Sequence, residues 1–372
     1  MMELNFSSLG ELVYIGHYRP IHSTRIHNYC NSQWYLLVLG ELVKNKVLTN
    51  AECWLICDQD LVFSQYGVTV RCFRDFTQMR KYRQHIDLLW VRGIHRNYLP
   101  ILNHMRCRLR MFYAASKRLV PIDWPYYDLI FVDDERHILP ASRIIPGATV
   151  KKVIKTTDPC IFKPLTNISK QFDLIMIGDM RTERKNFAAL VEILHDDPSL
   201  KTVIVGAPEK EFVDQLNRIG TKITYIDYCT RDELNLLFNQ TRITFLPYLL
   251  DAAPRVILES MAAGTPIVAH TGLFGGRDYI QSLVGILANP NKMLQAIHAI
   301  LQGDHIVNPK KIFDQQFTPC MAAQKLAEIL SEAIMAQGGA KPKDPPNRLK
   351  RLTNLHFFTE KKLKQYWGNP DL

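Results

Sequence analysis

The sequence predicts an α/β fold in two domains, each built on a parallel β-sheet. The chain has 372 residues, a length that corresponds to about two ordinary domains. In its middle part, short apolar runs alternate with segments of helical periodicity, which is the order of βαβ units. These runs are continuously apolar, as strands are when helices cover both faces of a sheet. The 47% of hydrophobic residues excludes a mainly disordered chain.

The first part of the chain predicts the first domain, at residues 1–155. A strand is expected at 12–15, ending in Gly16 and His17, and a helix at 32–43. Further strands are expected at 53–57, 68–72, 88–91, 111–114 and 129–132. Residues 146–164 hold several Pro and Lys residues without an amphipathic period, so we expect a strand there, followed by a linker.

The middle part predicts the second domain, at residues 156–337. Its expected strands are 172–177, 202–205, 223–226, 243–246 and 266–269. Its expected helices are 186–194, 209–219, 231–239 and 255–263. Residues 338–372 form a separate tail, rich in Gly and Pro at first and then basic with interleaved aromatic residues.

The net charge of +10 is unevenly distributed along the chain. Residues 1–165 carry +8, residues 166–337 carry −3, and the tail carries +5. The excess indicates an anionic partner for the first domain or the tail: an anionic glycan or lipid-linked molecule, an anionic membrane surface, or nucleic acid. A basic run between Arg80 and Arg118 concentrates this charge, although a solvated positive face would give the same pattern.

Eight cysteines are scattered without a CxxC pair or a Cys/His cluster at metal spacing. The first residues lack the basic and apolar regions of a signal peptide, and no apolar run reaches about 20 residues. We therefore expect a reducing compartment, which means a cytoplasmic protein that is either free or peripheral at a membrane.

The most specific motif is DAAPRVILESMAAGTPIVA at residues 251–269. Asp251 stands in the loop after an expected strand, and Glu259 follows about two turns into the next helix. Both acids fall at the carboxyl edge of the expected sheet, where α/β folds place ligands. The helix begins at Arg255 and Val256, and its N-terminus offers free N–H groups and a positive dipole end to an anion.

This motif resembles the donor domain of family-4-type retaining glycosyltransferases, the glycosyl transferases group 1, of the GT-B fold. The family pattern is Glu-x7-Glu, and this chain has Asp251-x7-Glu259. The resemblance implies two Rossmann-like domains that face a cleft. It also implies that Glu259 binds the nucleotide ribose, and that Asp251, one methylene shorter than the family glutamate, lies at the hydroxyls of the transferred sugar.

Two further segments are similar to the same family. In IMIGDMRTERKN at residues 175–186, Lys185 aligns with a lysine that binds the donor diphosphate. The arginine that accompanies it is Arg181 or Arg184, and spacing favours Arg181. Residues 271–278 match a Gly-Gly loop followed by an acid. The resemblance covers residues 155–290 well and the first 150 by architecture alone, and it implies that the base lies near residues 228–231.

In the first domain the family places a Gly-containing loop at the donor phosphate and a histidine at the transferred sugar. Gly16 with His17 occupies the place of the loop, and His95, after the strand at 88–91, is the candidate histidine. A loop histidine of purely structural role is an equal alternative for His17 and for His95.

The resemblance implies an enzyme of glycan biosynthesis. It would transfer a glycosyl group from a nucleoside-diphosphate sugar, such as a UDP- or GDP-sugar, to a hydroxyl acceptor with retention of configuration. Two cations beside the leaving diphosphate stabilise growing negative charge, so we expect neither a metal nor a cofactor. Asp133-Asp134-Glu135 differs from the metal-binding DxD pattern, and a solvated turn is the favoured interpretation. The alternatives are a GT-B-fold sugar-nucleotide epimerase and a glycosyltransferase that acts on nucleic acid.

Overall fold

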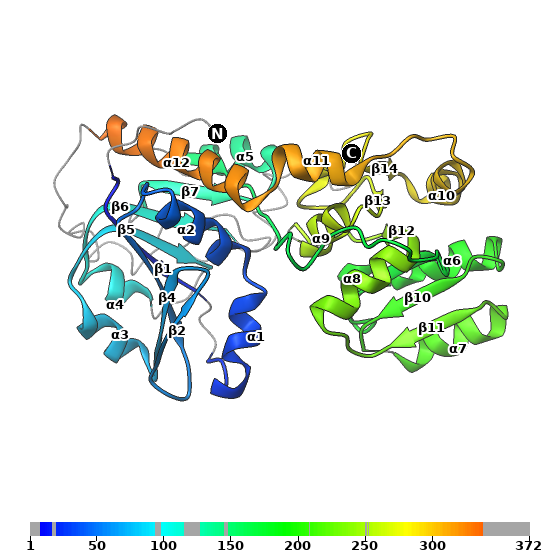
Figure 1. The fold of residues 1–372 in the computed structure, drawn as a ribbon, viewed down its shortest axis with the longest axis horizontal. Helices are drawn as coiled ribbons and strands as arrows, with labels where there is room; N and C mark the ends of the chain where they lie inside the picture. Colours follow the sequence, from blue (N-terminus) through cyan, green and yellow to red (C-terminus); the bar gives the residue numbers. More distant parts are fainter. Residues whose placement is uncertain are drawn as a thin grey trace. The chain divides into compact units, whose positions relative to one another are not determined.

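The computed structural model describes residues 8–16, 20–93, 98–114, 127–144, 148–207, 209–249, 251 and 253–337. The chain forms two compact units (Figure 1). The first comprises Met1–Lys155 together with Pro319–Leu372, and the second comprises Thr156–Thr318.

The first unit is built on an eight-stranded sheet of order β3-β4-β2-β1-β5-β6-β7-β8. All neighbouring strands are parallel except β3, which pairs with β4 as an antiparallel edge hairpin. The strands are β1 (Glu11–Ile15), β2 (Asn50–Ile56), β3 (Leu61–Gln65), β4 (Val68–Phe73), β5 (His85–Arg92), β6 (Arg106–Tyr113), β7 (Leu129–Val132) and β8 (Thr149–Lys152). The sequence predicted all of these except β3, whose residues alternate between half-buried and exposed.

Helices cover both faces of this sheet, which explains why its strands are apolar throughout. The helices are α1 (Ile26–Asn31), α2 (Trp34–Lys44), α3 (Phe76–Tyr82), α4 (Tyr98–Leu102), α5 (Ile138–Ile144) and α12 (Pro319–Ala336), with the 3-10 turns η1 (Ser23–Arg25) and η3 (Glu135–His137). One core lies under α2 and α12, and the other lies under α3 and α4.

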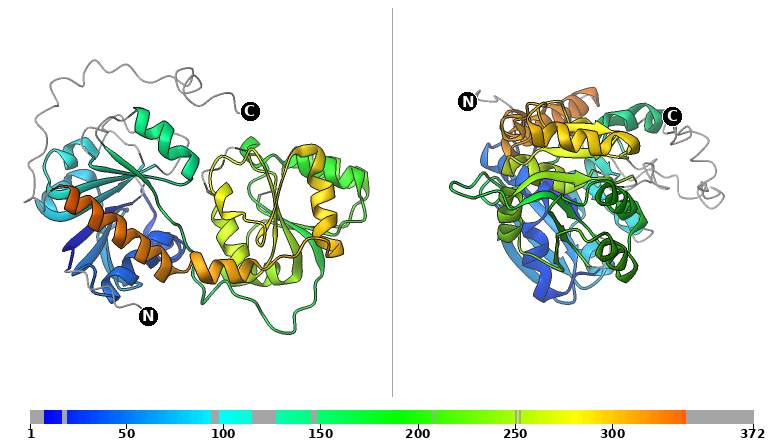
Figure 2. Two further views of the ribbon diagram at one scale, coloured as in Figure 1. Left: turned by 90° about the horizontal axis from the view of Figure 1, so that it is seen from above. Right: turned by 90° about the vertical axis from the view of Figure 1, so that its right-hand side faces the viewer.

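The last helix corrects the expected domain boundary. We expected residues up to 337 in the second domain, but α12 packs against α2 in the first unit (Figure 2). Its apolar face enters the core of that unit through Ala322, Ala323, Leu326, Ala327, Ile329, Leu330 and Ile334. Helical periodicity predicts such a face but contains no information about which sheet it covers. The tail predicted at 338–372 lies outside the described residues.

The second unit holds a six-stranded, fully parallel sheet of order β11-β10-β9-β12-β13-β14. The strands are β9 (Phe172–Ile177), β10 (Thr202–Val205), β11 (Ile223–Ile226), β12 (Thr241–Leu246), β13 (Ile267–His270) and β14 (Gly285–Ala288). Numbered within the unit, this is the doubly wound order 3-2-1-4-5-6. The sequence predicted the first five strands and missed β14.

The remaining elements connect and cover this sheet. The helices are α6 (Phe187–Asp196), α7 (Lys210–Ile219), α8 (Arg231–Gln240), α9 (Arg255–Ala263), α10 (Met293–Gln302) and α11 (Pro309–Gln316), with the 3-10 turns η4 (Glu183–Lys185), η5 (Arg277–Tyr279) and η6 (Pro290–Lys292). Local sequence fixes several ends: Thr230 and Glu233 form a capping box on α8, and Gly264 ends α9 in the left-handed conformation.

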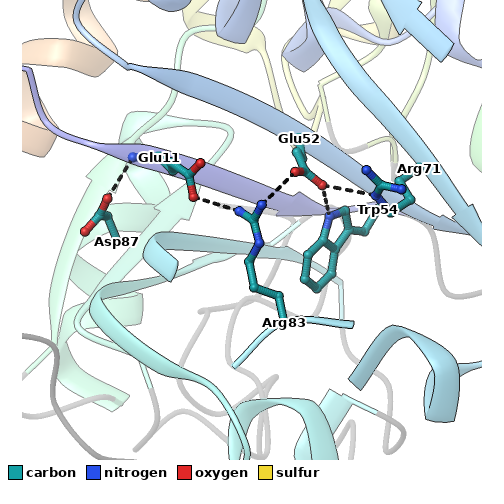
Figure 3. A network of polar contacts seen from close by, with 6 residues as sticks. All are labelled: Glu11, Glu52, Trp54, Arg71, Arg83 and Asp87. Atoms are coloured by element: carbon teal, nitrogen blue, oxygen red, sulfur yellow. Dashed lines mark hydrogen bonds and ion pairs between the residues drawn. The ribbon is translucent and has the colours of Figure 1, made fainter. Parts of the chain in front are cut away.

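A network of charged side chains holds α3 and its following loop to the first sheet (Figure 3). Arg83 donates to Glu11 Oε2 at 2.7 Å and forms an ion pair with Glu52 Oε1 at 3.3 Å. The buried Glu52 carboxylate also accepts from Trp54 Nε1 and Arg71 Nε. Because one carboxylate in the core has three donors, its burial on β2 is compensated.

Candidate functional site

The candidate site of the second unit lies where the strand order of its sheet reverses. β9 and β12 are neighbours, but the chain after β9 returns at β10 on one side and the chain after β12 returns at β13 on the other. Loops that diverge from adjacent carboxyl ends leave a crevice, which is the usual ligand position in such sheets. These two loops contain the motif residues Lys185 and Asp251.

Close backbone packing shapes the loop after β9. Gly178 has φ +153° and Gly206, after β10, has φ +139°, and a Cβ on Gly206 would lie 2.1 Å from the Gly178 carbonyl oxygen. The Lys185 side chain lies along Gly178, with its Cε 3.0 Å from where a Cβ would stand. Asn186 takes the left-handed conformation before α6 and donates to the Pro247 carbonyl at 3.1 Å. Glycine and asparagine are the residues that tolerate these conformations.

Lys185 is the centre of the site. Its ammonium group lies 2.6 Å from Asp251 Oδ2 and 3.8 Å from the centroid of the Tyr248 ring. The Tyr248 hydroxyl donates to the Ile177 carbonyl, which fixes the ring beneath the lysine. Burial lowers the pKa of Lys185, and Asp251 acts in the opposite direction. The lysine is thus a buried cation whose counter-ion is the first acid of the motif.

The glycine-rich segment after β13 packs on the Asp251 loop. Phe274 N donates to the Leu249 carbonyl at 2.9 Å, and Gly275 N donates to the Asp251 carbonyl at 3.0 Å. A Cβ on Gly276 would lie 3.1 Å from Ala253 Cα. The predicted Gly-Gly loop therefore supports the acid loop through its backbone.

Glu259 lies on α9, half-buried, and its carboxylate accepts no hydrogen bond from any described residue. Burial raises the pKa of Glu259, and Arg255 and Arg231 counteract it. A desolvated carboxylate with nearby cations but no direct donor is suited to accept hydrogen bonds from ligand hydroxyls. Arg255 and Val256, the other predicted donor residues, form the first turn of α9.

The two candidate arginines occupy different environments. Arg181 forms two hydrogen bonds to Asp179, at 2.8 and 2.7 Å, and its side chain is 64% exposed. Arg184 makes no ion pair with a described residue, and its charge acts on the pKa of Lys185 and of Tyr248. Spacing favoured Arg181, whereas the electrostatic coupling associates Arg184 with Lys185. Spacing along the sequence does not show that the Arg181 guanidinium donates two hydrogen bonds to the Asp179 carboxylate.

In the first unit, Gly16 directly follows β1, at the point where the sheet of that unit reverses its strand order between β1 and β5. A Cβ on Gly16 would lie 2.4 Å from Leu55 Cδ2. His17 and His95 follow the carboxyl ends of β1 and β5 and lie outside the described residues.

Sequence reasoning missed the roles of Tyr248 and Arg92. Tyr248 is the second residue after β12, and Arg92 is the last residue of β5, so position at the carboxyl end of a strand was the available signal. Arg92 entered the sequence analysis only as one of many basic residues.

The favoured interpretation of Asp133-Asp134 as a solvated turn is wrong, because both aspartates are buried. Asp133 pairs with Lys155 at 3.0 Å, and Asp134 accepts two hydrogen bonds from the Arg136 guanidinium. Within the described ranges, no group of three or more His, Cys, Asp or Glu side chains is arranged to hold a metal ion. The same ranges contain no helix that is both long and apolar enough to span a bilayer.

One family model matches the part of the chain that contains these motifs. Residues 159–304 match the family model of glycosyl transferases group 1. This group 1 segment contains the loops of Lys185 and Asp251 and the helix of Glu259. No curated protein sequence matches the chain.

Solved structures share the fold over both units. Sucrose-phosphate synthase from Thermosynechococcus elongatus is similar with a TM-score of 0.66 at 13% identity, covering 88% of this chain and 100% of that one. Anabaena HepE in complex with UDP and glucose gives 0.62 at 13% identity, covering 87% and 99%. Trehalose-6-phosphate synthase OtsA gives 0.61 at 12% identity, covering 90% and 100%. The fold is therefore GT-B, with two Rossmann-like units.

Proposed function

We propose that the protein transfers a glycosyl group from a nucleoside-diphosphate sugar to a hydroxyl acceptor, with retention of configuration and without a metal ion. The observation that carries the proposal is the 2.6 Å contact between Lys185 and Asp251 at the reversal point of the second sheet, with Glu259 on α9, the helix that follows the Asp251 loop. A cation for the diphosphate and two acids for ligand hydroxyls meet at one edge. The match of this segment to glycosyl transferases group 1 supports the assignment.

The second unit binds the donor in this proposal. Glu259 accepts hydrogen bonds from the ribose hydroxyls, and the N–H groups of Arg255 and Val256 at the start of α9 face the phosphates. HepE has been solved in complex with UDP and glucose and with UDP-glucose, and a trehalose-6-phosphate protein from E. coli has been solved with UDP-2-fluoro glucose bound. Uracil nucleotides are therefore the first donors to test.

Cations stabilise the diphosphate as it leaves. Lys185 is one, and we place Arg184 beside it in preference to Arg181, because Arg181 would first have to give up its two hydrogen bonds to Asp179. Positive groups aimed at a leaving diphosphate stabilise charge that grows in the transition state, which is the contribution a metal would otherwise make.

Asp251 has a double role in this mechanism. Without a donor it neutralises the buried Lys185 ammonium at 2.6 Å. A bound diphosphate competes for that ammonium, and the Asp251 carboxylate is then free to accept a hydrogen bond from a sugar hydroxyl. Donor binding thus gives Lys185 a new anionic partner, and a sugar hydroxyl replaces the ammonium group at the Asp251 carboxylate.

The test is calorimetric titration of the full chain with UDP, GDP and their sugars. We expect one nucleotide to bind, and Glu259→Ala to weaken its binding at least about tenfold, since a charge-assisted hydrogen bond to a buried carboxylate contributes about 1.5–3 kcal/mol. Glu192→Ala, on the exposed face of α6, is the matched control and leaves binding unchanged. Equal nucleotide affinity in wild type and Glu259→Ala contradicts the ribose assignment.

Once a donor is found, the anomeric configuration of the product follows from NMR of the transferred sugar, and activity in the presence of EDTA tests the metal-free proposal. Product that is an epimerised nucleotide sugar, formed without any acceptor, rejects transfer in favour of epimerisation.

A further inference from the structure

Arg92 lies at the carboxyl edge of the first sheet, outside the donor site. It ends β5, next to the end of β1 where the strand order reverses. The Tyr98 hydroxyl donates to the Gly16 carbonyl at 3.0 Å and to the Arg92 carbonyl at 3.3 Å, which holds the two strand ends together. The position is the first unit's counterpart of the one that Lys185 and Asp251 occupy in the second unit.

The Arg92 guanidinium is half-buried and has no carboxylate partner among the described residues. Its hydrogen bond from Nη1 goes to Gln33 Oε1 at 3.2 Å. Gln33 is fixed in this orientation, because its Nε2 donates to the Tyr29 carbonyl and to Ser32 Oγ, both at 3.0 Å. The glutamine thus presents an oxygen to Arg92 but supplies no negative charge.

The buried carboxylate of Asp133, whose pKa burial raises and the charge of Arg92 lowers, is already paired. Asp133 Oδ1 accepts from the Tyr113 hydroxyl at 2.6 Å and lies 3.0 Å from the Lys155 ammonium. The charge of Asp133 is therefore compensated by Lys155, and no carboxylate among the described residues pairs directly with Arg92. A partly desolvated cation without a counter-ion is unfavourable unless an anion from outside joins it.

Unused hydrogen-bond donors lie beside Arg92. The Tyr14 and Tyr35 rings stack at 3.9 Å between centroids, and Trp90 meets Tyr14 edge-on at 5.2 Å. The Tyr14 hydroxyl and the Trp90 indole N–H are buried without a partner among the described residues, and the Tyr35 hydroxyl lies beside the Tyr29 hydroxyl and the Cys53 thiol. The Tyr35 hydroxyl lies 3.5 Å from where a Cβ of Gly16 would stand, so these donors reach the same edge as Arg92. Buried donors without acceptors are rare in proteins, and a ligand oxygen would satisfy them.

We propose that Arg92 binds an anionic oxygen group, a phosphate or a carboxylate, carried by the acceptor. The guanidinium offers a planar fork that matches either group, and the aromatic hydroxyls beneath it favour oxygen atoms over an apolar ligand. The word acceptor rests on the proposed glycosyl transfer, whereas the anion site depends only on the geometry of the first unit. Arg92 is one of the basic residues that give residues 1–165 their net positive charge.

The experiment titrates the full chain with inorganic phosphate and with acetate at constant ionic strength, following tryptophan fluorescence. The ring centroids of Trp34 and Trp90 lie 6.0 Å apart beside the site, so we expect a bound anion to change the fluorescence emission of these tryptophans. The measurements are made on the Lys185→Ala variant, because this change weakens phosphate binding at the donor site and the signal then reports on the Arg92 site. We expect saturable binding, weakened at least about tenfold by adding Arg92→Gln. Arg143→Gln, an exposed arginine on α5, is the control with the same charge change.

The outcomes separate this inference from the proposed function. Tighter phosphate than acetate binding identifies a phosphorylated acceptor, and the reverse identifies a carboxylate. Equal anion affinity with and without Arg92→Gln overturns the site, even if UDP binds normally to the wild type. Anion binding that depends on Arg92 in a chain that binds no nucleotide keeps the site and rejects the transferase. If Arg92→Gln does not fold, Arg92→Lys, which keeps the charge but not the fork, must weaken phosphate binding, and unchanged affinity in that variant also overturns the proposal.

Discussion

Lys185 and Asp251 show at the scale of single residues how one ion pair can serve two states. Two separate sequence segments, 175–186 and 251–269, identified these side chains, but their direct contact at 2.6 Å is a finding of the structure. The pair is largely buried, so neither charge is well solvated and each depends on the other. The diphosphate must therefore compete with Asp251 for Lys185.

Asp251→Asn should strengthen the binding of UDP alone at neutral pH, roughly fivefold, because it removes a competing acceptor worth about 1 kcal/mol. It should also make that binding more sensitive to alkali. Burial lowers the pKa of Lys185 and Asp251 raises it, so without Asp251 the ammonium loses its proton at a lower pH. Calorimetry between pH 7 and pH 10 measures both effects.

Asp196→Asn, at the exposed end of α6, is the matched control and should follow the wild type at every pH. If Asp251→Asn weakens UDP binding at neutral pH as much as Lys185→Ala does, the two residues do not compete as described.

At the scale of elements, the ends of β9 and β10 approach so closely that they require glycine. Gly206→Ala places a Cβ 2.1 Å from the Gly178 carbonyl, so the loop that carries Lys185 must move. We expect a loss of about 3 kcal/mol in stability or more, together with loss of nucleotide binding. Gly220→Ala is the control, because Gly220 has a φ of +76°, which strains an alanine, but no atom lies within 4 Å of the added Cβ. This change should lower the stability by about 1–2 kcal/mol and leave nucleotide binding intact. Thermal unfolding and UDP titration of both variants decide the matter, and equal behaviour would show that the close approach is not required.

The Arg83 network is the corresponding element-scale feature of the first unit (Figure 3). Arg83→Met leaves the Glu52 carboxylate, 6% exposed, with two donors instead of three. We expect about 1–3 kcal/mol of lost stability by urea unfolding, and partial recovery in Arg83→Met/Glu52→Gln, which removes the buried charge as well. Lys81→Met, an exposed change on α3, should be neutral. A double variant no more stable than Arg83→Met would argue against a charge effect.

At the scale of the whole molecule, the first unit is completed by the end of the chain. The α12 face contributes seven apolar side chains to the α2 core, so that unit depends on residues more than 160 positions beyond its last strand. This is a contact of high sequence separation, which no local pattern can specify.

A chain of residues 1–318 should therefore have a destabilised first unit, and a chain of residues 1–337 should not. Burial of one large apolar side chain contributes about 1.5–3 kcal/mol, so loss of α12 removes several times that amount. In both truncated chains every tryptophan lies within residues 1–155, so tryptophan fluorescence during urea unfolding reports on the first unit alone. Coincident unfolding curves would mean that α12 is dispensable.

The sequence by itself determined most of the second unit. Its continuous apolar strands and helix caps act within a few residues, and the motif from Asp251 to Ala269 is contiguous, so strand positions, helix ends and candidate donor residues could be read along the chain. The edge strand β3 was missed because its residues alternate between half-buried and exposed, and β14 was missed because it is a four-residue strand that begins with glycine.

Only the tertiary structure decided which side chains pair across loops and which of the two units α12 packs on. The burial of Asp133 beside Lys155 and the contact of Arg92 with Gln33, in place of any described carboxylate, depend on groups far apart in the sequence. The choice between Arg181 and Arg184 depends on the side-chain contact between Arg181 and Asp179. Periodicity and spacing record the direction of a side chain relative to its own helix or strand, whereas charge compensation depends on distances through space, which folding sets.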